Sequence, residues 1–227
     1  MVVSPAKINL HLSVGPVRPD GYHELVTVFQ ALDLQDEMFV QRADDLSLET
    51  DARYIPTGPE NLALRAAALL QERFDVRWGA QISLSKNIPV AGGMAGGSTD
   101  AAAALLACNS IWGSPASHGE LLELAAELGS DVPFCLQGGT ALGSSRGEVL
   151  TPVLTSGSLT WVVAASFGEL STPKVYKRFD KMAGDGVPAP VMPKDLLLAL
   201  RSGDVESIGA CLHNDLQRPA ISLMPEL

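Results

Sequence analysis

The chain reads Pro89-Val90-Ala91-Gly92-Gly93-Met94-Ala95-Gly96-Gly97-Ser98-Thr99-Asp100 and continues directly into Ala101-Ala102-Ala103-Ala104. The four glycines let the backbone approach a ligand closely and turn its N–H groups toward it. The alanine-rich run that follows predicts a helix from about Thr99 to Trp112. A glycine-rich loop that feeds a helix N-terminus favours an anion, because free N–H groups and the helix dipole both face it. The segment therefore predicts a phosphate site.

The loop matches neither of two common nucleotide-binding patterns. No Gly-Lys-Ser/Thr follows it, so it is not a Walker A loop, and the Gly-x-Gly-x-x-Gly spacing of a dinucleotide-binding turn is absent. A flexible loop with an ordinary N-cap remains an alternative, since glycine-rich turns are common.

The bulk composition excludes several classes of protein. The 227 residues carry a formal net charge of −10, which argues against nucleic-acid binding. The sequence contains no long apolar run, so we expect no membrane-spanning helix. Its N-terminus lacks a basic segment followed by an apolar core, so we expect no signal peptide. The cysteines are widely spaced and odd in number, which fits a reducing cytoplasm: Cys108, Cys135, Cys211.

Strand and helix patterns mix along the chain without regular alternation. Apolar residues alternate from Lys7 to Val14, which predicts a strand, and Asn61 caps a helical pattern that ends near Phe74. Gly138–Val153 is typical of a hairpin, and Trp161–Ala165 of an apolar strand. We therefore expect an α+β fold. It divides near residue 150 into domains 1–150 and 151–227.

Two polar side chains interrupt the first strand. Lys7 and Asn9 are two residues apart, so their side chains share one face. The pattern by itself favours a solvent-facing role for both, because a half-buried strand alternates in the same way.

An aspartate lies in Gly129-Ser130-Asp131-Val132-Pro133-Phe134. An aspartate just before a proline that opens a helix is usually an N-cap. The alternative is chemical: phosphoryl transfer to an alcohol needs a carboxylate to take the hydroxyl proton and a cation to stabilise phosphoryl charge. Asp131 and Lys7 have the right chemistry, but their spacing does not show that they meet.

Three segments together resemble the GHMP kinase superfamily: Ser4–Leu10, Pro89–Ala102 and Gly129–Phe134. Further segments resemble one branch of it, the diphosphocytidyl-methylerythritol kinases. They are Arg18-Pro19-Asp20-Gly21-Tyr22-His23, Glu60-Asn61-Leu62, Gly138-Gly139-Thr140-Ala141 and Asn214-Asp215-Leu216-Gln217. The resemblance covers essentially the whole chain in family order, and the Asp-Gly-Tyr-His segment is its most discriminating part.

This resemblance implies a two-domain GHMP-kinase fold and a specific reaction. The enzyme would use ATP and Mg²⁺ to phosphorylate the 2-hydroxyl of a cytidine diphosphate-linked methylerythritol, in non-mevalonate isoprenoid synthesis. The implied partner is this small molecule, with no nucleic acid and no membrane. Two alternatives stay open: another GHMP kinase, acting on homoserine, mevalonate or a sugar, and a non-catalytic nucleotide-binding protein.

The resemblance also implies a role for individual residues. Asp131 would be the general base, Lys7 its charge partner, and Asn9 a substrate contact. Tyr22, His23 and Tyr176 would form the cytosine pocket. The nucleotide would be held by Asn61, Lys86, Pro89, Ala91, Gly92, Gly93, Met94, Ala95, Gly96, Gly97, Ser98, Thr99 and Asn109. Ser98, Thr99 and substrate phosphates all remain open as magnesium ligands.

The chain departs from the family pattern in two respects. Ala91 and Ala95 stand where many relatives have glycine, which puts the fine geometry of the loop in doubt, because alanine does not readily adopt positive φ. The glycine-rich third motif of relatives does not appear before Leu227. We therefore expect the second domain to be incomplete in this chain, which would then be a fragment of a longer protein.

Overall fold

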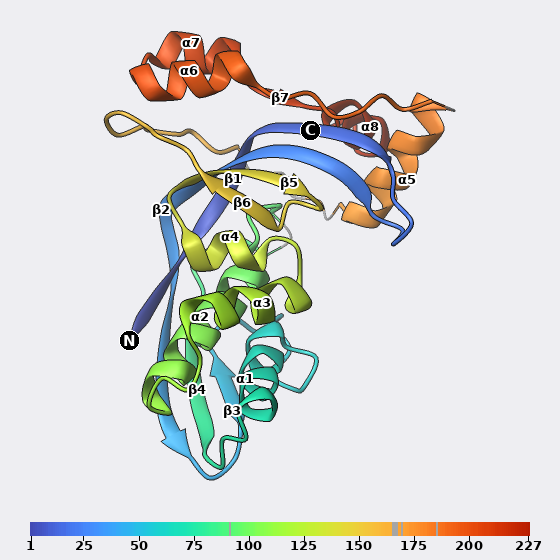
Figure 1. Ribbon diagram of the computed structural model, residues 1–227. Helices are drawn as coiled ribbons and strands as arrows, with labels where there is room; N and C mark the ends of the chain where they lie inside the picture. Colours follow the sequence, from blue (N-terminus) through green and yellow to red (C-terminus); the bar gives the residue numbers. More distant parts are fainter. Residues whose placement is uncertain (91, 165–167, 169, 185) are drawn as a thin grey trace. The chain divides into compact units, whose positions relative to one another are not determined.

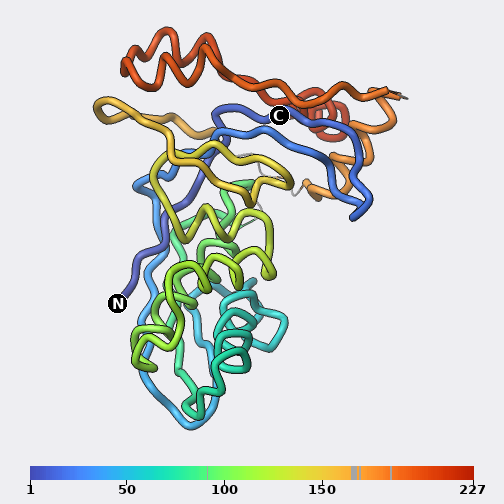
Figure 2. Tube along the Cα trace, viewed as in Figure 1, coloured from blue at the N-terminus to red at the C-terminus, as the bar shows by residue number. Residues whose placement is uncertain are grey.

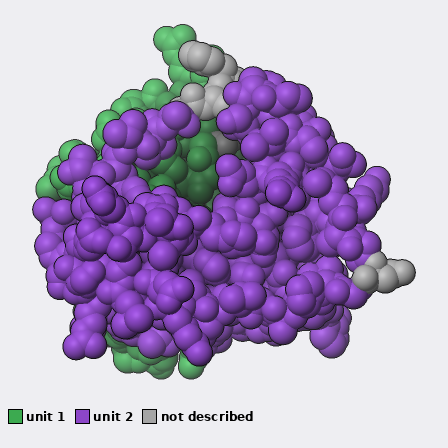
Figure 3. All heavy atoms as spheres, turned by 90° about the horizontal axis from the view of Figure 1, so that it is seen from above, with its two compact units in different colours: residues 1–8, 31–138 green, residues 9–30, 139–227 purple. Residues whose placement is uncertain are grey.

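The computed structural model describes residues 1–90, 92–164, 168, 170–184 and 186–227. Its contacts group the chain into two compact units, coloured in Figure 3. Unit 1 contains Met1–Ile8 and Ala31–Gly138, and unit 2 contains Asn9–Gln30 and Gly139–Leu227. This division differs from the predicted boundary near residue 150, because the long N-terminal strands supply residues to both units and the chain crosses between them after Gly138.

Helices and strands mix as the α+β prediction requires, and that prediction is confirmed (Figure 1). The strands are β1 (Val2–Val17), β2 (His23–Ala43), β3 (Ser47–Thr50), β4 (Gly79–Ser85), β5 (Thr140–Ser145), β6 (Val149–Pro152) and β7 (His213–Asn214). The helices are α1 (Leu62–Arg73), α2 (Gly96–Ile111), α3 (His118–Leu128), α4 (Val132–Gln137), α5 (Thr172–Ala183), α6 (Lys194–Ser202), α7 (Val205–Ala210) and α8 (Gln217–Leu223).

Unit 1 packs helices against one face of a sheet. β4 pairs antiparallel with the second half of β2 and parallel with β3. Its side chains alternate, so that Ala80, Ile82 and Leu84 are buried while the residues between them face outward. The buried face meets α1, α2, α3 and α4 in one core, whose largest fully buried members include Met38, Leu70, Leu105, Leu124 and Val132.

Helix α2 is the central helix of unit 1, and its first four alanines are all buried. It starts at Gly96, three residues before the predicted Thr99. The last two glycines of the loop therefore form the first turn of the helix. This matters for ligand binding, because the N–H groups of a first turn have no partner within the helix.

Unit 2 is built around the first half of β2. Leu25–Gln30 pairs antiparallel with β5, and β5 pairs with β6 as the predicted hairpin. β7 runs parallel to β1, with His11 opposite His213. The long curved paths of β1 and β2 can be followed in Figure 2.

The predicted strand Trp161–Ala165 is wrong for the part that the structure describes. Residues 161–164 form no strand, Ala165 lies outside the described residues, and Val162 is 97% exposed. An apolar run becomes a strand only where a neighbouring strand pairs with it, and among the described residues no strand pairs with 161–164.

Two further sequence predictions concern the environment of the chain. Within the described ranges, no helix has the length and apolar character needed to cross a membrane. Cys108, Cys135 and Cys211 are all free thiols.

Candidate functional site

Lys7 and Asp131 meet within unit 1. The Lys7 Nζ lies 3.5 Å from Oδ2 of Asp131, and the two side chains are 8% and 38% exposed. Lys7 is thus buried, which makes the solvent-facing interpretation wrong for this residue. Asp131 occupies the N-cap position of α4, yet its side chain makes no capping hydrogen bond. The interpretation of Asp131 as an ordinary helix cap therefore fails, and its carboxylate faces a buried cation instead.

The ion pair is tied to the glycine-rich loop by the backbone of β1. The Lys7 N–H donates to the Met94 carbonyl at 3.2 Å, and the Thr99 hydroxyl donates to the Pro5 carbonyl at 2.6 Å. Met94 is 5% exposed and packs with Ala6 and Ile88 in a small apolar cluster. These contacts anchor the middle of the loop beside the residues that carry the ion pair.

The loop has the backbone geometry of an anion site. Gly93 and Ala95 both adopt positive φ, at 70° and 60°, and α2 begins directly afterwards. A cavity of about 390 Å³ opens against this first turn. Ten residues of the predicted nucleotide set line it: Asn61, Lys86, Pro89, Gly92, Gly93, Met94, Ala95, Gly96, Gly97 and Ser98. Ala91 lies outside the described residues.

Two residues of the predicted nucleotide set lie elsewhere. The Thr99 hydroxyl is engaged by Pro5, and the residue is fully buried. Asn109 donates to the Ala116 carbonyl at 3.0 Å and accepts from the Ala116 N–H at 2.9 Å. Its side-chain amide therefore fastens the segment that follows α2, and Asn109 is not among the residues that line the cavity.

Asn61 and Lys86 line the cavity, but their polar atoms have partners in the protein. Asn61 caps α1 through the Ala63 N–H and donates to the Pro56 carbonyl. The Lys86 ammonium contacts two carboxylates, Asp36 at 2.5 Å and Asp100 at 2.7 Å. Both side chains therefore shape the cavity wall rather than present free donors to it.

The predicted cytosine residues lie in unit 2, where they form one aromatic group. His23 is buried and stacks on Tyr176, with ring centroids 5.2 Å apart and an interplanar angle of 23°. Its Nδ1 donates to the Gly15 carbonyl at 2.8 Å, since a carbonyl only accepts, and its Nε2 lies 3.3 Å from Asp180. Stacking on His23 thus occupies one face of the Tyr176 ring.

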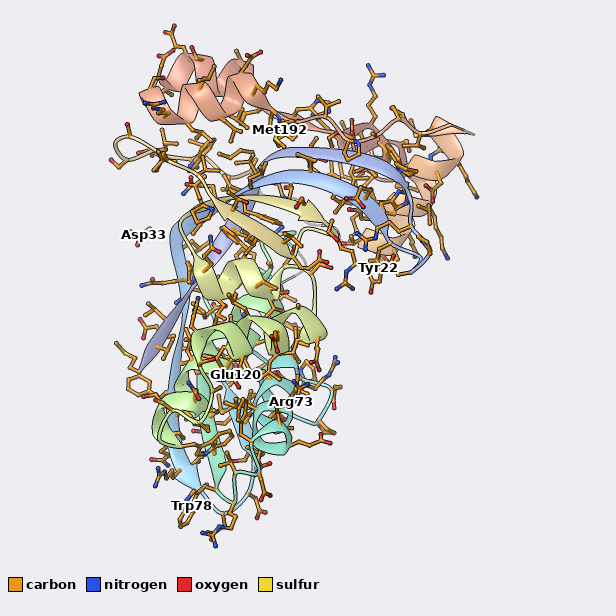
Figure 4. The ribbon with its side chains drawn as sticks, viewed as in Figure 1. Tyr22, Asp33, Arg73, Trp78, Glu120 and Met192 are labelled. Carbon is orange, nitrogen blue, oxygen red and sulfur yellow. The ribbon has the colours of Figure 1, made fainter. Side chains whose placement is uncertain are left out.

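Tyr22 and Asn9 lie outside the stacked pair of His23 and Tyr176 and are more accessible to solvent than His23. Tyr22 is 52% exposed (Figure 4), and the Arg146 guanidinium lies 4.9 Å from the centre of its ring. Such a cation over an aromatic face is attractive, and about half of the residue stays accessible to solvent. Asn9 is half-buried, and its amide donates to the Thr27 hydroxyl at 2.7 Å.

Comparisons with known proteins identify the family. Residues 61–139 match the family model described as the GHMP kinases N terminal domain. The chain is 50% identical to the 4-diphosphocytidyl-2-C-methyl-D-erythritol kinase of Streptomyces avermitilis, over 98% of this chain and 76% of that protein. It is equally similar to the enzyme of the same name from a Nocardioides species, over 99% of this chain and 77% of that protein.

The chain belongs to the 4-diphosphocytidyl-2-C-methyl-D-erythritol kinase family of GHMP kinases. A crystal structure of 4-(cytidine 5'-diphospho)-2C-methyl-D-erythritol kinase superposes with a TM-score of 0.74 at 35% identity, covering 100% of this chain and 79% of that chain. A homoserine kinase from Cytophaga hutchinsonii follows with a TM-score of 0.67 at 19% identity, covering 98% of this chain and 73% of that chain. At that identity the likeness concerns the fold alone.

Sequence patterns missed three carboxylates of this family member: Asp36, Asp100 and Asp180. Asp36 is fully buried against Lys86, but nothing in its local sequence marks a charged partner fifty residues away. Asp100 closes the glycine-rich segment, which was a usable signal. Asp180 lies four residues after Tyr176, so helical spacing places both on one face of α5.

Proposed function

We propose that this chain transfers the γ-phosphoryl group of ATP to the 2-hydroxyl of 4-diphosphocytidyl-2-C-methyl-D-erythritol, a step of non-mevalonate isoprenoid synthesis. One observation carries the proposal: Lys7, which pairs with Asp131, lies on a strand whose backbone hydrogen-bonds to Met94 and Thr99 of the glycine-rich segment. A base, a cation and an anion site are thereby joined in one compact unit. The relatives named for this reaction, at about 50% identity, support the choice of substrate.

The proposed chemistry assigns the proton and the charge to two side chains. Asp131 accepts the proton of the attacking hydroxyl while that oxygen forms a bond to the γ-phosphorus and the bond from phosphorus to the ADP oxygen breaks. Lys7 stabilises negative charge on the phosphoryl oxygens and keeps the carboxylate oriented. Burial strengthens this contribution, because little solvent screens Lys7, whose side chain is 8% exposed.

The phosphates of ATP are proposed to bind the first turn of α2. Gly96, Gly97 and Ser98 line the cavity, and a side chain at Gly97 would meet no atom within 4 Å, so this backbone is open to a ligand. Free N–H groups and the helix dipole both favour an anion at this place.

A magnesium ion carried by the nucleotide fits the same wall. Magnesium prefers oxygen ligands and usually keeps substrate phosphates and waters among them. Ser98 lines the cavity, whereas the Thr99 hydroxyl donates to the Pro5 carbonyl, so Ser98 is the residue we assign to the ion. When bound, the ion would neutralise charge on the phosphates.

Recognition of cytosine is assigned to unit 2. Tyr22 offers an exposed ring face for stacking, which every base tolerates. The backbone of His23 supplies the hydrogen bonds that distinguish cytosine from uracil, since both ring nitrogens face protein partners, and Tyr176 stacks on the imidazole ring. Asn9 completes the assignment as a contact to the acceptor.

Phosphorus NMR of the product mixture tests the function. Incubation with Mg²⁺, ATP and 4-diphosphocytidyl-2-C-methyl-D-erythritol should give ADP and one new phosphomonoester, and Asp131→Asn should form it roughly 100- to 10,000-fold more slowly. Homoserine, mevalonate and a hexose serve as competing acceptors. Turnover of one of these in place of the cytidine compound would overturn the substrate assignment. ATP binding without transfer to any acceptor would favour a non-catalytic nucleotide-binding protein.

A further inference from the structure

The hydroxyl of Thr27 joins two residues of a neighbouring strand. Thr27 lies in the first half of β2, which neighbours β1 and pairs with β5 (Figure 1). Its side chain is buried, and its Oγ1 donates to the His11 carbonyl at 2.7 Å. The same oxygen accepts from Nδ2 of Asn9, also at 2.7 Å. A threonine of unit 2 is thus in direct contact with the residue that is assigned to the acceptor.

The direction of these two hydrogen bonds fixes the orientation of the Asn9 amide. A carbonyl oxygen only accepts, so the single hydroxyl proton of Thr27 is committed to His11. The Thr27 oxygen can then only accept from Asn9, and the amide has to turn an N–H toward it. The reversed amide would bring two acceptors together with no proton between them, which is unfavourable. Nδ2 of Asn9 therefore faces Thr27, and Oδ1 lies on the other side of the amide group.

Packing on the other side of β2 holds the Thr27 side chain in place. Thr27 lies opposite Gly143 of β5, and a Cβ built on Gly143 would lie only 2.9 Å from the Thr27 methyl carbon. The methyl group thus occupies the space that a larger residue at position 143 would need. A β-branched side chain has few χ1 rotamers, so its methyl and its hydroxyl are placed together. The rotamer that offers the hydroxyl to Asn9 is therefore the one that the packing against Gly143 retains.

Asn9 is the member of this group that a ligand can reach. It is half-buried, whereas Thr27 and His11 are both buried. An amide oxygen has two lone pairs, so Oδ1 can accept from a ligand whatever else it contacts in the protein. An acceptor at this position selects a hydrogen-bond donor, and the donors of a polyol are its hydroxyl groups.

We propose that Thr27 is a positioning residue that orients the Asn9 amide, so that Oδ1 of Asn9 accepts a hydrogen bond from a hydroxyl of the polyol that is not phosphorylated. The inference deepens the proposed function and rests on it, because that function makes Asn9 a contact to the acceptor. It adds which of the two polar amide atoms meets the substrate and what kind of group the substrate has to offer there. Thr27 acts through Asn9 and does not touch the substrate itself.

Substrate analogues test the orientation of the amide in the wild-type chain. The polyol has two hydroxyls besides the one that is phosphorylated, at C1 and C3. At each, a deoxy analogue removes the group, and a deoxyfluoro analogue replaces it by an atom that accepts but cannot donate. At the position that meets Asn9, both analogues should lower kcat/KM by roughly 2- to 10-fold, the worth of one neutral hydrogen bond. The same analogues with Asn9→Ala correct for the effect of fluorine on the reacting hydroxyl.

Variants of Thr27 test its role in positioning. Thr27→Val replaces the hydroxyl by a methyl group of similar size and should lower kcat/KM for the cytidine acceptor by roughly 2- to 10-fold, with an unchanged KM for ATP. Thr27→Ser keeps the hydroxyl and should retain the wild-type kcat/KM. In an Asn9→Ala background, Thr27→Val should have no further effect, because the amide that it positions is gone. Thr151→Val changes an exposed threonine on β6 and serves as the matched control, with wild-type kinetics expected.

The outcomes separate this inference from the proposed function. Recovery of the rate by fluorine, or full rates with all four analogues, overturns the inference while the kinase stands. A Thr27→Val effect that adds to that of Asn9→Ala does the same, since it identifies Thr27 as purely structural. Kinetics are measured at a temperature where thermal melts show each variant folded, and the analogue experiment needs no Thr27 variant. Absence of phosphoryl transfer from ATP to the cytidine compound by the wild type overturns the proposed function, and this inference with it.

Discussion

The ammonium nitrogen of Lys7 lies 3.5 Å from Oδ2 of Asp131, and the aspartate side chain makes no hydrogen bond to the helix that it precedes. We therefore expect Asp131→Asn to lower kcat by roughly 100- to 10,000-fold, because a positioned general base contributes that much. Lys7→Ala should lower kcat comparably, through lost stabilisation of transition-state charge. Steady-state kinetics with the cytidine diphosphate-linked acceptor measures both.

Thermal unfolding provides the control for Asp131. Ser117 is a true cap, since it accepts from the Glu120 N–H and forms a capping box, and Ser117→Ala should destabilise the protein by about 1 kcal/mol. Asp131→Ala removes no cap, so any stability that it loses reports the broken contact with the buried Lys7 ammonium. A large loss of stability with near wild-type turnover in the Asp131 variants would identify the residue as structural.

Asn109 should prove to be a structural residue. Both polar atoms of its amide bond the backbone of Ala116, and Asn109→Ala would leave these buried groups unpaired. The expected cost is about 1–3 kcal/mol of unfolding free energy, with an unchanged KM for ATP at a temperature where the variant is folded. Denaturant unfolding and kinetics together check this. A raised KM with unaltered stability would restore Asn109 to the nucleotide site.

Ala95 carries backbone strain at the start of α2. Its φ of 60° lies in the left-handed region, which costs an alanine on the order of 1 kcal/mol. Ala95→Gly removes this strain at the expense of some unfolded-state entropy, so we expect a net gain of up to about 0.5–1 kcal/mol. Chemical denaturation of the two proteins side by side measures it. A clear loss of stability would show that the packing of the alanine methyl group stabilises the protein by more than the positive φ costs.

The raised pKa of Asp100, about 7 against an ordinary value of 3.8, makes stability depend on pH. Between these two values the folded state binds more protons than the unfolded state, so stability falls as pH rises and levels off above about pH 7. Asp100→Asn should remove this part of the profile. Unfolding free energies from pH 5 to 8 test the sign, and a profile that Asp100→Asn leaves unchanged would contradict it.

Cytosine specificity should depend on the group around His23. Tyr176→Ala removes the ring stacked on the imidazole and should raise the KM for the cytidine substrate by about 2- to 10-fold, the worth of one aromatic pair. The uridine analogue should be a worse substrate for the wild type, because mismatched buried polar groups cost about 1–3 kcal/mol each. Equal kcat/KM for both nucleosides would remove His23 from base recognition.

Local sequence patterns determined the parts of this protein that depend on neighbours in the chain. The glycines at 92, 93, 96 and 97, followed by four alanines, specify a loop that runs into a helix, because backbone freedom and helix propensity are local properties. The alternation of buried and outward-facing side chains in β4 also follows from neighbouring residues, and so does the capping of α1 by Asn61. Short segments such as Asp20–His23 resemble the family closely enough to indicate it.

Only the tertiary structure decided which charges meet. Lys7 and Asp131 are 124 residues apart, and no spacing rule could show that their side chains meet. The partners of Lys86, at positions 36 and 100, come from a strand and a helix that are joined only by folding. Burial and Coulomb interactions depend on distance in space rather than along the chain. For the same reason only the structure could show that the amide of Asn109, which the family resemblance assigned to the nucleotide, hydrogen-bonds to the backbone of Ala116.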